Sequence, residues 1–547
     1  MKIFLTAFIL LNSYSILNAQ QKVDLILFNA RIYTIDPSFT ICEAVAINKG
    51  RIKATGSTKY ILAKYSSNNQ LDLKGKFIYP GFIDAHAHFY RYGLDLQTAD
   101  LRGAKSWNDI LEKLKSFSKT NRDGWLIGRG WDQNLWERKE FPTREKLDQL
   151  FPDRPVVLSR IDDHAVIANK KALDIAELHP GMKLHGGQIE TKNGELTGIL
   201  IDNATDLVYN KIPEPTKNQS ANALIKAQEN CFAVGLTTVD DCGLDYKEAL
   251  LIDSLQKAGV LKMRLYVMLS DNKHNYDLLF RNGKIKTDFL NVRSFKVYAD
   301  GALGSRGACL LSPYLDKPGW SGFLLSERQH FDSVARIIYE HGFQMCTHAI
   351  GDSGNRTILQ IYSKYLKGKN DKRWRIEHAQ VVNENDFSFF GNYNIVPSVQ
   401  PTHATSDMRW AGNRLGSKRM KGAYAYKRLL KENNWIPLGT DFPVEDISPL
   451  KTFFAAVIRK DYSGYPANGF QMENSLSRSE AIRGMTIWAA KANFEENEKG
   501  SIENGKFADL VILDKDLMTS NENELKYIRV FMTIVNGKIV YHQNALK

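Results

Sequence analysis

Short apolar runs alternate with amphipathic helical patterns through the middle of the chain. In the helical patterns at 331–338 and 358–365, apolar residues recur at positions i, i+3, i+4 and i+7. Ser477 and Glu480 form a capping-box pattern that opens a further helix. The apolar runs that predict strands are 79–88, 235–240, 263–268, 294–298, 344–348, 374–378, 395–399 and 436–441. Eight strands alternating with helices predict an α/β fold, a (β/α)8 barrel of the TIM type.

Both ends of the chain carry a different pattern, of short β-segments separated by turns. Residues 20–77 and 499–547 follow this pattern, and we expect them to meet in one small β-sandwich domain. The barrel domain then spans 78–498. Residues 102–230 are too long for one helix and two loops between the first and second strands, so we expect an insertion over the barrel mouth.

The composition is that of a folded globular protein, with 547 residues and a formal net charge of +12. Lysines and arginines are scattered, and no motif interleaves aromatic with basic residues. We therefore expect a small-molecule substrate and no nucleic-acid partner. The positive charge also leaves open a protein that binds a polyanionic envelope without metal. The oligomeric state stays open, a homo-oligomer included.

The first 19 residues resemble an export signal. Lys2 gives a positive start, residues 3–11 form a short apolar stretch, and Leu17-Asn18-Ala19 offers a cleavage site before Gln20. The apolar stretch is shorter than the roughly 20 residues of a spanning helix, so we expect no stable membrane anchor. These features predict a periplasmic or extracellular protein. The five cysteines show no CxxC spacing, and we expect buried free thiols, although export permits disulfides.

Two histidines one residue apart, His86 and His88, follow the apolar run that begins at Tyr79. On a strand, residues i and i+2 point to the same face, so both imidazoles converge on one point and suit a divalent transition metal. Polar residues also stand at the ends of later strands: Lys296, His348, His378 and Asp441. Because the carboxyl ends of barrel strands face one cavity, these residues predict a single metal pocket.

The order His-x-His, Lys, His, His, Asp resembles the amidohydrolase superfamily. The local sequence motifs are similar to those of amidohydrolase family 3, which includes N-substituted formamide deformylase-like metal-dependent hydrolases. The likeness covers nearly the whole chain after the export signal. The matching segments are 80–88, Gly128-Arg129-Gly130-Trp131-Asp132-Gln133, 296–301, Thr347-His348-Ala349-Ile350-Gly351-Asp352, 375–380, Gly439-Thr440-Asp441-Phe442-Pro443 and 499–510.

By this resemblance, His86, His88 and Asp441 hold one divalent metal, with zinc the metal expected. His348 and His378 hold a second, and Lys296, carboxylated by CO2, bridges the two. A carbamate supplies two anionic oxygens, whereas an ammonium group would repel the metal. Because carboxylation cannot be read from a sequence, the number of metals stays open at one or two per chain.

The resemblance also implies an enzyme that hydrolyses a carbon–nitrogen bond other than a peptide bond, in an amide, N-formyl or N-acyl group. Metal binding lowers the pKa of water towards about 7 and so provides hydroxide. Asp441 takes the proton of the attacking water and passes it to the leaving nitrogen, or it serves as a ligand alone. The alternatives are hydrolysis of a cyclic amide or an ester, and a non-catalytic binding or regulatory protein on the same fold.

Three further residues are candidates for substrate contact. Trp131 and His164 belong to the insertion, and we expect them to line the cavity mouth. His403 follows the seventh strand and could reach the same site. A structural role is the alternative for each of the three.

Overall fold

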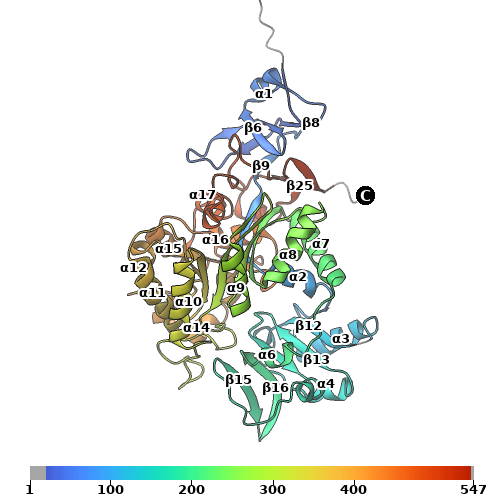
Figure 1. Ribbon diagram of the computed structural model, residues 1–547, viewed down its shortest axis with the longest axis vertical. Coiled ribbons are helices and arrows are strands. Elements are labelled where there is room, and N and C mark those ends of the chain that lie inside the picture. Colours follow the sequence, from blue (N-terminus) through green and yellow to red (C-terminus); the bar gives the residue numbers. More distant parts are fainter. Residues whose placement is uncertain (1–19, 123, 544–547) are drawn as a thin grey trace, which may run out of the picture.

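A computed structural model describes residues 20–122 and 124–543 (Figure 1). Its centre is a parallel sheet whose strands follow one another in chain order and curve into a barrel. The strands are β10 (Phe82–Ala87), β17 (Leu236–Leu244), β18 (Arg264–Ser270), β20 (Leu290–Tyr298), β21 (Gln344–Ala349), β22 (Arg375–His378) and β23 (Val396–Ser398). Each pairs in parallel with the next. The predicted (β/α)8 architecture is confirmed.

The eighth predicted strand, 436–441, closes the barrel without forming a regular strand. Leu438 makes a parallel bridge to Val399, and its carbonyl accepts the amide N–H of Ala85 on β10. Pro437 has no N–H to donate to a ladder, which explains why the segment is irregular. The segment still lies between β23 and β10, so its end reaches the same rim as the other strands.

Helices cover the outside of the barrel (Figure 1). They include α7 (Lys217–Ala233), α8 (Tyr246–Lys257), α9 (Lys273–Asn282), α10 (Arg328–Glu340), α11 (Asp352–Leu366), α15 (Tyr426–Asn433) and α17 (Arg478–Gly484). The predicted stripe of α10 is its buried face: Phe331, Val334, Ala335 and Ile338 all pack into the main core. The predicted capping box of Ser477 and Glu480 opens α17.

Outside the barrel lie two further sheets, of which the first is built from N-terminal strands alone and the second combines strands from both ends of the chain. One has the order β6-β5-β2-β8, and the other has the order β26-β25-β24-β9-β3-β4. Their strands are β2 (Leu25–Phe28), β3 (Arg31–Tyr33), β4 (Ile41–Cys42), β5 (Ala44–Asn48), β6 (Arg51–Gly56), β8 (Gln70–Asp72), β9 (Phe77–Pro80), β24 (Leu510–Leu513), β25 (Val530–Val535) and β26 (Lys538–His542). Ile47 of the first sheet and Ile534 of the second share one apolar core. The exact domain limits at 77/78 and 498/499 stay a prediction.

A separate mixed sheet lies between β10 and β17 in the chain, where the insertion was expected. Its order is β11-β12-β13-β14-β16-β15, and it sits at the end of the barrel away from the two terminal sheets (Figure 1). The strands are β11 (Ala99–Asp100), β12 (Leu126–Trp131), β13 (Val156–Arg160), β14 (Ala165–Ala168), β15 (Gly187–Lys192) and β16 (Glu195–Asp202). The chain returns to the barrel through α7, which packs against α2 (Phe89–Asp95).

The export signal predicted at 1–19 lies outside the described residues. Within 20–122 and 124–543, no helix is long and apolar enough to cross a membrane. All five cysteines lie in the described part of the chain and are free thiols, of which Cys231, Cys242 and Cys346 are buried.

Candidate metal centre

A cavity of about 1350 Å³ opens between the carboxyl ends of the barrel strands and the insertion. The barrel supplies most of the residues that could bind a metal at its wall. Lining residues include His88, Lys296, His348, His378, His403 and Asp441 from the barrel and His164 from the insertion. His86 lies just behind this wall and is fully buried. The predicted site residues therefore meet at one place, apart from Trp131.

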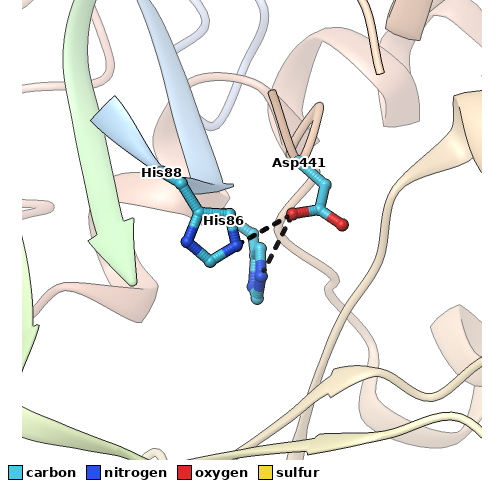
Figure 2. A group of neighbouring side chains, drawn as sticks. All are labelled: His86, His88 and Asp441. Carbon is cyan, nitrogen blue, oxygen red and sulfur yellow. Dashed lines mark ion pairs between the residues drawn. The ribbon is translucent and has the colours of Figure 1, made fainter. Parts of the chain in front are cut away.

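His86, His88 and Asp441 form one group of potential ligands (Figure 2), and His378, His403 and Asp441 form another. Nε2 of His88 lies 3.3 Å from Oδ1 of Asp441, and Nε2 of His86 lies 3.6 Å from the same oxygen. His86 is on β10, and His88 stands directly before α2. The i, i+2 spacing on the strand brings both rings to the carboxylate.

A hydrogen bond at Nδ1 fixes the tautomer and the orientation of each of these two imidazoles. His86 donates from Nδ1 to Oε2 of Glu377 at 2.6 Å, and His88 donates from Nδ1 to the carbonyl of Cys242 at 2.9 Å. A carboxylate and a carbonyl can only accept, so Nδ1 carries the proton and Nε2 keeps its lone pair. Such partners behind a ligating histidine orient the ring and raise its basicity.

His378 approaches the same carboxylate from β22. It donates from Nδ1 to Oε1 of Gln400 at 2.7 Å, and its ring lies 4.6 Å from that of His86. The ring of His348 lies 4.7 Å from that of His378, and Nε2 of His348 has no hydrogen-bond partner. The two histidines predicted to share a second metal are therefore neighbours, with one ring nitrogen of His348 unused.

His403, which the sequence indicated only as a residue that could reach the site, lies within hydrogen-bond distance of Asp441. Its Nε2 is 3.1 Å from Oδ2 of Asp441, and its Nδ1 is 3.2 Å from Oε1 of Glu445. Burial alone would lower the pKa of His403. The hydrogen bonds to these two carboxylates have a larger effect in the opposite direction, so the pKa lies well above its ordinary value. Both ring nitrogens thus donate, so His403 acts as a cationic partner of Asp441 although its position would suit a ligand.

Left-handed backbone turns two of these side chains towards the centre. His378 has φ of 73° and Asp441 has φ of 63°. Glu377 faces the barrel interior, where it meets His86, so regular alternation would point the next side chain outward. The unusual φ of His378 reverses that direction. Strained backbone of this kind is concentrated at functional sites.

Lys296 extends from β20 into the same group. Its side chain is buried, and Nζ lies 3.1 Å from Nε2 of His86. Burial lowers the pKa of Lys296, whereas Tyr298, Cys242 and Glu377 raise it by more, so the net shift is upward. As an unmodified ammonium group, Lys296 therefore donates to the lone pair that His86 would offer to a metal.

The charge states of the other groups are those that a metal requires. Burial, followed by the charge of Lys296, lowers the pKa of His86 to about 4. Burial also holds the pKa values of His348 and His378 well below their ordinary range, so these imidazoles are neutral. Burial alone would raise the pKa of Asp441, but the hydrogen bond from His403 holds it well below its usual value.

Two buried polar atoms of this group lack a hydrogen-bond partner: Oδ1 of Asp441 and Nε2 of His348. Buried polar atoms are nearly always paired, so two orphans in one cluster need an explanation. Neutral imidazoles with an ionised carboxylate are the donor set of divalent transition metals. The residues present therefore fit a metal centre.

Comparison with known proteins agrees with this geometry. A family model described as the amidohydrolase family matches residues 70–541. The chain belongs to the amidohydrolase family.

Relatives in the family match along nearly the whole chain. YtcJ of Bacillus subtilis (strain 168), an amidohydrolase by name, is 32% identical over 94% of this chain and 98% of its own. N-substituted formamide deformylase of Arthrobacter pascens is 26% identical over 96% of this chain and 99% of its own. The crystal structure of a metal-dependent hydrolase from Pyrococcus horikoshii OT3 superposes with a TM-score of 0.75, at 28% identity, over 91% of this chain and 99% of that one. This protein is thus a metal-dependent hydrolase of the amidohydrolase family.

The insertion contributes to the amidohydrolase cavity through His164 and not through Trp131. His164 lines the cavity, and its Nδ1 lies 2.6 Å from Oδ1 of Asp202. Burial lowers the pKa of His164, but the bond to Asp202 and its charge raise it to about 9. Trp131 is fully buried in the core of the insertion and donates from Nε1 to the carbonyl of Leu158. The prediction that Trp131 contacts substrate is therefore wrong, because its indole packs between Trp136 and Phe141.

The sequence did not single out the residues that hold the histidines: Glu377, Gln400 and Asp202. Glu377 was visible as a carboxylate inside an apolar strand, where a buried acid needs a partner. Gln400 lies two residues after the end of β23, close to a strand end where polar side chains are informative. Asp202 gave no local signal, because its partner His164 comes 38 residues earlier in the chain.

Proposed function

We propose that this amidohydrolase cleaves a carbon–nitrogen bond other than a peptide bond in a small molecule, in an amide, N-formyl or N-acyl group. The observation that carries the proposal is the unpaired Oδ1 of Asp441, buried between two imidazoles at the floor of a large cavity. The name of the Arthrobacter relative supports N-substituted formamides as the first substrates to test.

In this proposal His86, His88 and Asp441 hold one divalent metal, and His348 and His378 hold a second. Zinc is the metal we propose, since imidazole and carboxylate ligands suit it. Lys296 would bridge the two after its amine is carboxylated by CO2. Modification would also remove the positive charge that Nζ now holds 3.1 Å from Nε2 of His86. When bound, the metal polarises the acyl oxygen and lowers the pKa of a water molecule.

The protein's own groups then control the proton. Asp441 takes the proton of the attacking water on one carboxylate oxygen and gives it to the leaving nitrogen, which departs as an amine. His403 donates to Oδ2 of Asp441 and is itself held by Glu445, so the carboxylate keeps one orientation. Oδ1 has no protein donor and faces Nε2 of His86 and of His88, so it is the oxygen that would bind the metal.

The experiment combines metal analysis with a substrate panel. Zinc-loaded protein is tested on N-alkylformamides, N-acetylamines, cyclic amides and esters, with the Asp441→Asn variant as the matched control. Hydrolysis of the open-chain amides that is lost in the variant supports the proposal. Turnover of cyclic amides or esters alone would replace it with the alternative reaction. Failure of every substrate by metal-loaded protein would favour a binding or regulatory role.

We also propose that the protein is exported and works in the periplasm or outside the cell. The basis is the signal-like pattern at 1–19, with the cleavage site after Ala19. Sequencing the amino terminus of protein recovered from its natural cell tests this directly. A mature chain that begins at Gln20 supports export, and an intact first segment in the cytoplasm would contradict it.

A further inference from the structure

The insertion brings one hydrogen-bonded pair of side chains to the cavity. His164 lies in the turn between β13 and β14, and Asp202 ends β16. Nδ1 of His164 lies 2.6 Å from Oδ1 of Asp202, and the amide N–H of Asp202 donates to the carbonyl of His164 at 2.9 Å. Side chain and backbone therefore hold the two residues in one geometry.

The carboxylate of Asp202 is locked between the insertion and the barrel. Its side chain is fully buried, and Oδ2 has no hydrogen-bond partner. A Cβ atom at Gly301 would lie 2.5 Å from either oxygen, so only glycine lets the loop after β20 approach this closely. Asn203 next to it donates from Nδ2 to the carbonyl of Leu325, at 2.9 Å. The pair is thus fixed relative to the strand that carries Lys296.

This arrangement leaves Nε2 of His164 for a ligand. The ring of His164 lies 5.2 Å from that of His348, and so continues the row of imidazoles that runs from His86 through His378. Among the described residues Nε2 of His164 has no hydrogen-bond partner, although the ring lines the cavity. A fully buried, ionised carboxylate needs a cation beside it, and His164 is the side chain that pairs with Asp202, so both ring nitrogens of His164 carry a hydrogen and Nε2 can donate.

We propose that His164 binds the acyl oxygen of the substrate through Nε2, and that Asp202 is the residue that positions it. The inference rests on the proposed amide hydrolysis and assigns one further contact in that reaction. A hydrogen bond to the acyl oxygen strengthens as the oxygen gains negative charge, so it accelerates the chemical step more than it tightens substrate binding. In this proposal the insertion covers the cavity and also supplies a residue that acts in the reaction.

The test uses the zinc-loaded, full-length protein with N-butylformamide as substrate. His164→Ala is expected to lower kcat by about 10²-fold with little change in KM, since one preorganised donor has an effect of this size. Asp202→Ala is expected to lower kcat similarly. Because Asp202 acts through His164, the double variant should be no slower than His164→Ala. His179→Ala, which removes an exposed histidine of the same insertion, is the matched control and should match the wild type.

Two further measurements separate a substrate contact from a structural role. Replacement of the acyl oxygen by sulfur, in N-butylthioformamide, weakens hydrogen bonding, so the wild type should prefer the oxygen substrate by a larger ratio than His164→Ala does. Asp202→Asn keeps the shape of the side chain and should fold normally, yet still lower kcat. Metal content and thermal unfolding of each variant should remain those of the wild type.

The outcomes separate this inference from the proposed amide hydrolysis on which it rests. A wild-type protein that hydrolyses no amide overturns the proposed function, and the inference with it. An active wild type together with an unchanged kcat in His164→Ala overturns the inference alone. The same holds if the losses of His164→Ala and Asp202→Ala multiply in the double variant, or if the preference for oxygen over sulfur is unaltered.

Discussion

The barrel rim and the insertion line the same cavity, but they place their side chains by different means. On the rim, the strands and the segment that closes the barrel bring His86, His378 and Asp441 together, and left-handed φ turns the last two inward. In the insertion, His164 depends on Asp202 and on the glycine contact that fixes it. The comparison teaches that the proposed metal ligands come from topology, whereas the proposed substrate contact comes from tertiary packing. The following changes test that division.

The largest effect is expected at Asp441. Asp441→Asn removes the group that moves the proton, and kcat/KM should fall by about 10³-fold on every substrate that the wild type hydrolyses. Steady-state kinetics on the substrate panel measure this. Asp371→Asn, on an exposed carboxylate, is the control and should retain full activity. A loss confined to some substrates would mean that Asp441 selects substrates and does not transfer the proton.

Glu377 should have the next effect, through His86. Glu377→Gln weakens the acceptor that orients the His86 ring, and metal affinity or activity should fall by roughly 10- to 100-fold. Competition with a chelator gives the affinity. Unchanged metal binding and unchanged activity would show that the strand position alone fixes His86.

A change inside the insertion should affect stability without affecting the metal. Arg160 is buried and donates to Asp132 at 2.6 Å and to Gln133 at 2.8 Å, and it also pairs with Asp162. Arg160→Met leaves these carboxylates without their cation and should lower the free energy of unfolding by about 3 kcal/mol. Urea unfolding measures the loss. Metal content that fell in parallel would contradict the separation of the two regions.

The smallest effect is expected at Trp131. Trp131→Phe keeps an aromatic ring in the core but removes the hydrogen bond from Nε1 to the carbonyl of Leu158 and part of the indole's packing, a loss of about 2 kcal/mol in stability. The values of kcat and KM should not change. A clear rise in KM would restore Trp131 as a substrate contact.

The sequence predicts the barrel well because strand and helix periods are local properties. The run predicted at 79–88 contains β10 (Phe82–Ala87), although Tyr79 and Pro80 belong to β9, and the stripe of α10 is where the pattern placed it. It predicts the eighth strand less well, since the segment forms no regular strand and is held by isolated contacts with Val399 and Ala85. Periodicity also gave the wrong environment for Trp131, because an indole beside glycines is compatible with either a rim or a core.

The residues of the candidate site could also be predicted only in part. Residues at strand ends, such as His348 and His378, could be found from sequence because a barrel gathers its strand ends. The direction of His378 could not, since it depends on a left-handed φ at a residue other than glycine. The pairing of His403 with Asp441, and that of His164 with Asp202, join segments that share no sequence pattern. Such contacts become visible only when the packed structure is known.

The most direct test of the central claim is the metal content of the purified mature protein, compared with that of Lys296→Ala. A bridged centre built from the rim predicts about two metal equivalents in the wild type and a clear fall in the variant. About one equivalent in both would contradict the bridge and leave His86, His88 and Asp441 as a single site. No bound metal, even after reconstitution with zinc, would contradict the account of the rim as a hydrolytic metal centre.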